Sequence, residues 1–490
     1  MNHKKLKILF VSAEVEGFSK TGGLADAAKA LPIALRNLGH DVKIITPFYR
    51  NINHREQARH CFDLTLDTNS PRPEVQFTVH QLSLDGIPVL TIDNAHYFDR
   101  QGLYGEDHRA YQDNGERFAF FCLACLQACE ESNFIPDIIH CNDWHTGLIP
   151  YLLKTRYEES IHFARTKTVL TIHNACYQGI FDKSQLNLIP EVSACMDERI
   201  LENYNYINYL KAGVIYSDKI NTVSPNYASE LLTTLGSHGM SKHFLERIHD
   251  FEGILNGCDY NDWNPKTDPF IAANFSADDL SGKVICKKAL QKELGLPESV
   301  NPIFGMVCRL TEQKGFGLLL PMLERVLKHN LQFVIIGSGD PAITGQLNAI
   351  AAHFPGKFKF IDTYSEKLSH RVEAGCDFFV MPSLFEPCGL NQLYSFSYGT
   401  LPIVRAVGGL KDTVMDYDQD PDNANGFVFD DPDPSQLLNL MRRALLLYVE
   451  HPEEMVRLKN QAMRSNFCWS NSAKHYERLY YNAIYQLHNW

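Results

Sequence analysis

The chain has 490 residues, a formal net charge of −12, 44% hydrophobic residues and 21% charged residues. This composition is typical of a globular protein, and the length predicts two or three domains. The negative charge argues against nonspecific binding to nucleic acid or to anionic membranes, because the overall field repels phosphates. Basic residues beside the motifs described below are therefore expected to act locally.

The cysteines and the hydropathy pattern indicate a cytoplasmic protein. Thirteen cysteines at irregular spacings do not suggest a disulfide framework. The apolar run after residues 1–5 is too short for a signal peptide, and no apolar run reaches the roughly 20 residues of a membrane-spanning helix. Cys122, Cys125 and Cys129 have a spacing that places them on one helix face, but the surrounding segment is apolar, which favours buried thiols over metal ligands.

In chain order, short apolar strand candidates alternate with longer helix candidates, which is the pattern of parallel α/β sheets. In the first half the expected strands are 8–12, 42–46, 89–92, 138–141, 169–172 and 219–223. The expected helices between them include 24–38, 116–128 and 207–216. Residues 75–84 and 87–92, joined by Asp85-Gly86, are expected to form a β-hairpin.

A polar segment at 256–264, rich in Asn, Asp and Gly, interrupts this pattern. A second series of expected strands follows at 303–307, 333–336, 358–361, 378–381, 401–404 and 427–428. We predict two Rossmann-like domains joined near residue 260. Ligands of such sheets bind at the carboxyl ends of the strands, and the motifs follow strand candidates, so both domains are expected to direct their loops into one shared cleft.

The most informative motif is the run from Lys20 to Asp26, which follows an apolar stretch at 8–11. A lysine and paired glycines between a strand and a helix allow backbone N–H groups, a helix N-terminus and an ammonium group to converge on an anion, so this motif predicts a phosphate site. A glycine turn with a solvated lysine would be the better interpretation if the motif stood alone. A second anion-binding segment, 308–315, contains Arg309 and Lys314 and also follows a strand candidate.

A series of sequence runs in this order resembles the bacterial starch and glycogen synthases. Members of that family are retaining glucosyltransferases that extend an α-1,4-glucan from a nucleotide sugar. The matching runs are 20–26, 140–145, 171–174, 177–179, 210–213, 222–225, 255–257, 309–315 and 385–390.

The resemblance implies a GT-B fold, in which two Rossmann-like α/β domains face each other across a cleft. It implies that residues 1–260 form the acceptor-side domain and residues 261–468 form the domain that binds the nucleotide sugar. It also implies that residues 469–490 contain a helix that crosses back to the N-terminal domain.

The resemblance places Arg309 and Lys314 on the diphosphate of the donor, with Lys20 approaching from the other domain. An isolated lysine or arginine is usually a solvated surface group, but the position after a strand, with Gly315 at a helix start, favours an anion site. Fixed cations can stabilise the leaving diphosphate without a metal ion. Asp-x-Asp spacings at 416–420 and 431–433 lie in polar turns, so we expect no metal and no cofactor.

Glu386 follows the expected strand 378–381 and precedes a constrained Pro-Cys-Gly turn. A glutamate in the first turn of a helix, favoured by the helix dipole, is the alternative interpretation. The resemblance implies that Glu386 binds the hydroxyls of the transferred glucose and stabilises oxocarbenium-like charge. Related GT-B transferases often carry a second glutamate eight residues later, where this chain has Tyr394, and the starch and glycogen synthases share that departure.

The resemblance implies roles for four further positions, and three of them also have a structural alternative. His173 follows a strand, where histidine is often a structural residue that bonds to nearby backbone, whereas the resemblance places it at a glucose hydroxyl or the β-phosphate. Asp143 is implied to lie at the reacting sugar. Asn256 is implied to contact the sugar, and is equally suited to a turn. Tyr364 matches the residue that stacks on adenine, or it caps the core.

The resemblance adds Gly22, Gly23, Asp26, Gly389 and Leu390 to the substrate-binding candidates. Three departures from the family pattern are present: no proline in 15–18, Leu384 in place of a frequent arginine, and a poor match at 235–252. The last departure leaves the acceptor-side surface undefined.

The expected function is metal-independent, retaining transfer of glucose from ADP-glucose to the nonreducing end of an α-1,4-glucan, by a front-face route because no nucleophile is well placed. A glucan-binding regulatory protein with a dead active site is an alternative, but it should have lost Lys20, Arg309, Lys314 or Glu386. A phosphorylase is a second alternative, and it would need a lysine site for pyridoxal phosphate.

Overall fold

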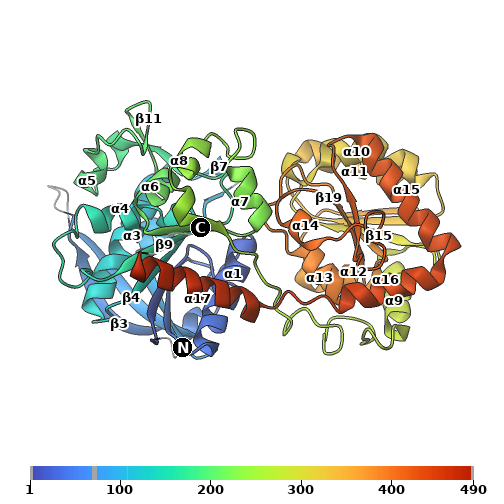
Figure 1. The fold of residues 1–490 in the computed structure, drawn as a ribbon, viewed down its shortest axis with the longest axis horizontal. Coiled ribbons are helices and arrows are strands. Elements are labelled where there is room, and N and C mark those ends of the chain that lie inside the picture. Colours follow the sequence, from blue (N-terminus) through green and yellow to red (C-terminus); the bar gives the residue numbers. More distant parts are fainter. Residues whose placement is uncertain (1–3, 69–73, 107–108, 487–490) are drawn as a thin grey trace. The chain divides into compact units, whose positions relative to one another are not determined.

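The computed structural model describes residues 4–68, 74–106 and 109–486. These residues form two compact units (Figure 1). Unit 1 contains the described residues up to Asn256 together with those from Trp469 onward, and unit 2 is Gly257–Cys468. The first boundary therefore lies at the start of the polar segment 256–264, where the alternating pattern of the sequence is interrupted.

Unit 1 is built on a nine-stranded sheet with the order β14-β13-β9-β8-β1-β2-β5-β4-β3. Neighbouring strands from β14 to β5 are parallel, and β5, β4 and β3 form an antiparallel extension. The strands are β1 (Lys7–Val11), β2 (Asp41–Pro47), β3 (Arg59–Leu66), β4 (Val75–Leu84), β5 (Ile87–Asp93), β8 (Ile138–Asn142), β9 (Lys167–Ile172), β13 (Lys219–Thr222) and β14 (Phe251–Gly253).

Helices cover both faces of this sheet, because alternate residues of its central strands are apolar on opposite sides. In β1, Ile8 and Phe10 join the core that contains α1 and α17, while Leu9 and Val11 join the core that contains α3. The helices of unit 1 are α1 (Gly23–Asn37), α2 (Ala95–Phe98), α3 (Asn114–Glu131), α4 (Leu148–Lys154), α5 (Pro190–Ser193), α6 (Tyr209–Tyr216), α7 (Pro225–Leu231), α8 (Ser241–Glu246) and α17 (Trp469–Tyr485).

Short elements complete unit 1. Strands β10 (Ile180–Asp182), β12 (Tyr206–Asn208) and β11 (Leu201–Glu202) form a small antiparallel sheet, and β6 (Gly105–Glu106) pairs with β7 (Arg109–Ala110). Its 3₁₀ helices are η1 (Arg55–Gln57), η2 (Trp144–Thr146), η3 (Lys183–Gln185) and η4 (Ile248–Asp250). The segment that matches the family poorly therefore contains α8 and leads into the edge strand β14.

Helix α17, red in Figure 1, packs against α1 and the sheet of unit 1 although the whole of unit 2 precedes it in the sequence. Its tyrosines bond to buried polar groups of the strands. The Tyr480 hydroxyl lies 2.7 Å from His140 Nδ1, and Asn221 Nδ2 donates to the Tyr476 hydroxyl at 3.0 Å. These bonds satisfy side chains that would be costly to bury alone, so α17 is an integral part of unit 1.

Unit 2 has a parallel six-stranded sheet with the order β17-β16-β15-β18-β19-β20. Numbered within the unit this is 3-2-1-4-5-6, the strand order of dinucleotide-binding folds. The strands are β15 (Ile303–Val307), β16 (Gln332–Ile336), β17 (Phe358–Ile361), β18 (Phe378–Met381), β19 (Leu401–Arg405) and β20 (Phe427–Phe429). The helices are η5 (Glu312–Lys314), α9 (Ser281–Leu294), α10 (Phe316–Leu327), α11 (Pro341–His353), α12 (Glu366–Gly375), α13 (Asn391–Ser397), α14 (Gly408–Thr413), α15 (Pro434–Glu450) and α16 (Pro452–Met463).

The expected parallel strands and the β4–β5 hairpin are present. The main differences are the antiparallel strand β3, the small sheet of unit 1, and the later start of α6, since residues 206–208 form β12. Cys122, Cys125 and Cys129 are buried in α3 among apolar side chains, as expected. Within the described ranges no helix is long and apolar enough to cross a membrane.

Candidate active site

The predicted site residues follow strands at the topological switch point of each sheet. In unit 1, β1 lies between β2 and β8, and in unit 2, β15 lies between β16 and β18. Connections leave two such neighbouring strands in opposite directions, which opens space for a ligand at their carboxyl ends. The loops after β1, β8, β15 and β18 carry Lys20, Asp143, Lys314 and Glu386 respectively.

The lysine–glycine loop (Lys20–Gly23) leads directly into α1, which begins at Gly23. Lys20 Nζ lies 2.6 Å from Glu16 Oε2 and 2.8 Å from Asp26 Oδ1. Burial lowers the pKa of Lys20, but the two carboxylates more than offset this effect and hold that pKa above its ordinary value. Burial raises the pKa of Asp26 to about 6, although Lys20 opposes the rise. The ammonium group is therefore balanced by the chain's own carboxylates.

The sequence predicted that backbone N–H groups of the lysine–glycine loop bind an anion, but two of them already have a partner inside the protein. The N–H groups of Thr21 and Gly22 donate to Oε2 of Glu14, a glutamate that is only 3% exposed. An internal carboxylate thus takes the place where the sequence motif suggested a bound anion. Ala25 N makes the first backbone bond of α1, to Gly22 O at 3.2 Å, so the N–H groups of Gly23 and Leu24 before it can bind an anion together with Lys20.

Asp143 and His173 lie together at the ends of β8 and β9. Asp143 has a positive φ of 56°, unusual for a residue other than glycine, and its Oδ1 accepts from His173 N at 2.7 Å and from Asn174 N at 3.4 Å. Burial raises the pKa of Asp143 to about 7, and these two N–H groups oppose the rise. Backbone strain of this kind concentrates at functional sites.

His173 is held as a neutral ring. Its Nε2 lies 2.9 Å from Asn142 Oδ1, while Asn142 Nδ2 donates to Val11 O at 2.9 Å. The amide oxygen of Asn142 is therefore the acceptor, so Nε2 of His173 carries the proton and Nδ1 is the acceptor of the ring. Burial lowers the pKa of His173 to about 3, which agrees with a neutral imidazole.

In unit 2, Lys314 and Glu386 form a close ion pair. Lys314 Nζ lies 2.6 Å from Glu386 Oε2, which also accepts from Ser383 Oγ at 2.9 Å, and Glu386 is 7% exposed. Arg309 lies on the same loop as Lys314, is exposed, and has no ion-pair partner among the described residues. The loops after β15 and β18 therefore combine an exposed guanidinium with an ion pair between a half-buried ammonium group and a buried carboxylate.

Gly315 allows these two loops to meet. Its φ is +78°, and a Cβ added there would lie 1.9 Å from Pro382 O. The main chains are joined beside it, since Leu384 N donates to Gln313 O at 2.8 Å. A side chain at residue 315 would therefore push the Lys314 loop away from the Glu386 turn.

We expect Gly315→Ala to lower both the thermal stability and the rate of the reaction, with the rate falling at least tenfold, because a misplacement of about 1 Å can cost up to 10²-fold. Gly317→Ala is the matched control: Gly317 is exposed in α10 with nothing within 4 Å of its added Cβ, so the change should raise stability slightly. Differential scanning calorimetry and initial rates measure both effects. Equal rates for the two variants would contradict the packing argument.

The remaining predicted residues are distributed as follows. Asn256 is buried, and its Oδ1 has no hydrogen-bond partner within the described part of the chain, so it can accept a bond from a hydroxyl. Gly389, with a φ of +72°, and Leu390 follow Glu386 and precede α13. Tyr364 is 57% exposed and lies on the loop after β17, two strands from β15 and hence about 10 Å away along the sheet.

Sequence analysis missed Gly408 and Gly409, at the start of α14. A Cβ on Gly408 would lie 1.9 Å from Glu386 O, and Gly409 N donates to that oxygen at 3.2 Å. The paired glycines after β19 were the available signal, since they repeat the arrangement of a strand, two glycines and a helix seen at Gly22-Gly23. They hold the turn that carries Glu386 in place.

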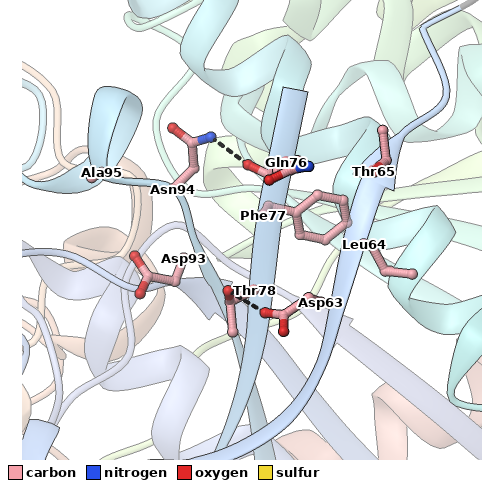
Figure 2. A pocket seen from close by; sticks show the side chains of 9 residues that line it. All are labelled: Asp63, Leu64, Thr65, Gln76, Phe77, Thr78, Asp93, Asn94 and Ala95. Atoms are coloured by element: carbon pink, nitrogen blue, oxygen red, sulfur yellow. Dashed lines mark hydrogen bonds between the residues drawn. The ribbon is translucent and has the colours of Figure 1, made fainter. Parts of the chain in front are cut away.

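Figure 2 shows a pocket of about 450 Å³ elsewhere in unit 1, over β3, β4 and the end of β5. Its polar groups already bond to one another: the Thr78 hydroxyl donates to Asp63 at 2.6 Å, and the Asn94 amide donates to Gln76 O at 2.9 Å (Figure 2). None of the predicted site residues lines it. We therefore assign the chemistry to the strand ends rather than to this pocket.

Comparison with known proteins agrees with this geometry. Residues 7–246 match the family model described as starch synthase catalytic domain, and residues 287–464 match the one described as glycosyl transferases group 1. The chain is 54% identical to glycogen synthase of Aeromonas salmonicida over 98% of both chains. It is 51% identical to glycogen synthase of Vibrio cholerae over 97% of this chain and 99% of that one.

The chain belongs to the glycogen synthase family. The solved catalytic domain of starch synthase IV from Arabidopsis thaliana, bound to ADP and acarbose, has a TM-score of 0.89 and 34% identity, covering 98% of this chain and 100% of that one. Sucrose-phosphate synthase of Thermosynechococcus elongatus shares the fold alone, with a TM-score of 0.60 and 17% identity over 98% of this chain and 100% of that one. The prediction of a two-domain GT-B fold is confirmed.

Tyr394 lies eight residues after Glu386 and belongs to an aromatic stack in unit 2. The ring of Trp263 stacks between Tyr394 and His370, with centroids 3.9 Å from each. His370 Nδ1 in turn lies 2.8 Å from Asp268 Oδ2. Tyr394 therefore helps to anchor the segment that follows the unit boundary.

The Asp-x-Asp spacings serve as structural turns. Asp416 accepts from Val428 N at 2.8 Å, Asp418 pairs with Arg443, and Asp433 caps α15. Across the described residues, no group of three or more His, Cys, Asp or Glu side chains could hold a metal ion.

The raised pKa of Asp143 has a consequence for stability. The folded carboxyl keeps its proton up to about pH 7, whereas the unfolded one loses it near its ordinary pKa of 3.8. The native state therefore loses stability from this group as the pH rises from 4 to 7, and the penalty is constant above that range. We expect Asp143→Asn to be more stable than the unchanged protein, with a difference in Tm that widens over this range while activity falls.

Asp63→Asn in the same unit is the control for that measurement. Hydrogen bonds from Thr78 and His60 hold the pKa of Asp63 below its ordinary value, so the variant should lose stability above pH 4 rather than gain it. Calorimetric scans at pH 5 and pH 7.5 compare the two variants. A constant difference in Tm for Asp143→Asn at both pH values would show that its carboxyl is not perturbed.

Proposed function

We propose that the chain transfers glucose from ADP-glucose to the nonreducing end of an α-1,4-glucan, with retention of anomeric configuration and without a metal ion, as a step of glycogen biosynthesis. The observation that carries the proposal is the close ion pair between Lys314 and the buried Glu386, on the same loops as Arg309 at the switch point of unit 2. The match to named glycogen synthases, at 54% and 51% identity over nearly the full length of the chains, supports the choice of donor and acceptor.

Arg309 and Lys314 are proposed to bind the diphosphate of the donor. Transfer leaves negative charge on that diphosphate, and preorganised cations stabilise it most as the charge develops. When no nucleotide sugar is bound, the charge of Lys314 is balanced by Glu386. A diphosphate would compete for the ammonium group, which releases the Glu386 carboxylate toward the sugar, where positive charge develops.

In unit 1, His173 and Asp143 are proposed to act at the reacting glucose, and Lys20 is proposed to act at the diphosphate of the donor. The neutral ring of His173 can accept a hydrogen bond from a glucose hydroxyl through Nδ1, because Nε2 is occupied by Asn142. Asp143 has a pKa of about 7 and is anchored by backbone N–H groups. The ammonium group of Lys20 lies at the start of α1, which begins at Gly23, and Asp26 in the first turn holds it there. The helix dipole also favours an anion at this end.

Further substrate contacts are assigned from position. The exposed ring of Tyr364, after β17, is suited to stack on adenine. Oδ1 of Asn256, which has no partner among the described residues, can accept a hydrogen bond from a sugar hydroxyl. The Gly389-Leu390 segment can bring its main chain close to the glucose. Gly22 contributes through the shape of its loop, because its N–H is taken by Glu14.

The direct test is incorporation of labelled glucose into glycogen from ADP-glucose and from UDP-glucose, in buffer containing EDTA. We expect transfer from ADP-glucose that EDTA does not reduce. Glu293→Gln, which removes half of an exposed ion pair with Arg371 in unit 2, is a control for charge changes away from the site. Glycogen binding without transfer would favour the regulatory alternative, and loss of activity in EDTA would refute the metal-free route.

A further inference from the structure

The carboxylate of Glu14 is enclosed by donors from two different loops. Oε2 accepts from the N–H groups of Thr21 and Gly22, and Oε1 accepts from the Thr21 hydroxyl at 2.6 Å and the Tyr104 hydroxyl at 2.7 Å. Each oxygen therefore has two donors, which fills its usual capacity. A carboxylate occupied in this way is poorly suited to bind substrate or to move a proton.

Glu14 is itself held firmly just after β1. Ser12 Oγ donates to Glu14 O at 2.6 Å, and Val15 and Ser19 form a β-bridge on the other side. Thr21 and Gly22 directly follow Lys20, so fixing their N–H groups fixes the direction in which Lys20 leaves the main chain. The ammonium group then meets Glu16 and Asp26 at the start of α1.

Tyr104 connects the same carboxylate to the Asp143 turn. The ring of Tyr104 lies against His145 with centroids 4.7 Å apart, and His145 stacks on Trp144 at 4.0 Å. Both residues directly follow Asp143 in η2. Glu14 is thus bonded on one side to the lysine–glycine loop and, through Tyr104, packed on the other side against the turn that carries Asp143.

We propose that Glu14 is a positioning residue, which sets the geometry of Lys20 and of the Asp143 turn and does not touch the substrate. The inference rests on the proposed function, since it concerns the same transfer reaction. A carboxylate suits this position because it can accept from both backbone N–H groups and both hydroxyls at once, and charge-assisted bonds are about twice as strong as neutral ones.

The test is a double-mutant cycle between Glu14→Gln and Lys20→Ala, with kcat from glucose transfer and the Kd of ADP from calorimetry. In Glu14→Gln the negative charge is lost, and an NH₂ in place of Oε1 can no longer accept from the hydroxyls of Thr21 and Tyr104, so the loop is held by weaker bonds and shifts. We expect kcat to fall by about 10- to 10²-fold, the effect of a small misplacement, with the Kd of ADP within about threefold of the unchanged protein. In the Lys20→Ala background the same change should lower kcat clearly less than in the unchanged protein, with the remaining loss coming from the Asp143 turn.

Glu116→Gln is the matched control, since Glu116 also accepts from a tyrosine, Tyr97, at 2.7 Å in unit 1, and its kcat should be unchanged. Tyr104→Phe removes a single hydrogen bond to Glu14 and should lower kcat by a few-fold. This variant tests the same inference if Glu14→Gln does not fold. Fully multiplicative effects of Glu14→Gln and Lys20→Ala, or a normal kcat in both Glu14→Gln and Tyr104→Phe, would overturn the inference. Absence of transfer in the unchanged protein would instead refute the proposed function.

Discussion

Glu386→Gln is expected to bind ADP-glucose within about threefold of the unchanged affinity and to lose about 10²- to 10³-fold in kcat. The carboxylate stabilises a sugar that becomes cationic only as the bond to the diphosphate breaks, so its charge contributes more to the transition state than to the ground state. The glutamine keeps the shape of the side chain and its bond from Ser383. Calorimetry with the donor and initial rates of transfer separate the two effects.

Glu293→Gln, in an exposed pair of the same unit, should leave both quantities unchanged. An equal loss in affinity and in kcat for Glu386→Gln would mean that this residue anchors the donor and has no special role in the transition state.

Lys314→Ala and Arg309→Ala should each lower kcat by about 10²-fold or more, because each removes one preorganised cation from the diphosphate. Their effects on stability should differ. Lys314→Ala leaves the buried Glu386 without its cation, which is strongly destabilising for a buried pair, whereas Arg309 is exposed and has no ion-pair partner in the described chain. Thermal scans should therefore show a lower Tm for Lys314→Ala alone.

The double variant Lys314→Met/Glu386→Gln separates the two roles of the pair. It removes both charges together, so we expect most of the lost stability to return while transfer stays absent. Unchanged Tm in Lys314→Ala, or near-normal kcat in both single variants, would contradict the assignment of this pair to the donor site.

The sequence predicted the parallel sheets because their strands are apolar runs that alternate with amphipathic helices. It also predicted that Lys20, Asp143, Lys314 and Glu386 follow strands, since a motif directly after an apolar run needs only local information. Strand β3 was missed because only its second half alternates apolar with polar residues, at Phe62, Leu64 and Leu66, and because most of its residues are exposed; its pairing with β4 completes the sheet.

The contacts that the sequence could not predict join residues far apart in the chain. Nothing in the sequence near Glu14 indicates that its carboxylate accepts hydrogen bonds from the N–H groups of the lysine–glycine loop and from Tyr104, which is 90 residues away. The stack of Trp263 on Tyr394 likewise joins two segments that no local pattern connects. Such contacts depend on tertiary packing, which overrides what a motif alone suggests.

The measurement that tests the central claim most directly is the stereochemistry of transfer. Time-resolved proton NMR can follow the first product formed from ADP-glucose and a short α-1,4-glucan in buffer containing EDTA. The account predicts a new α-1,4-linked glucose at the nonreducing end, released ADP in equal amount, and no β-linked product at early times. A β-linked first product, or a requirement for added metal ion, would contradict it.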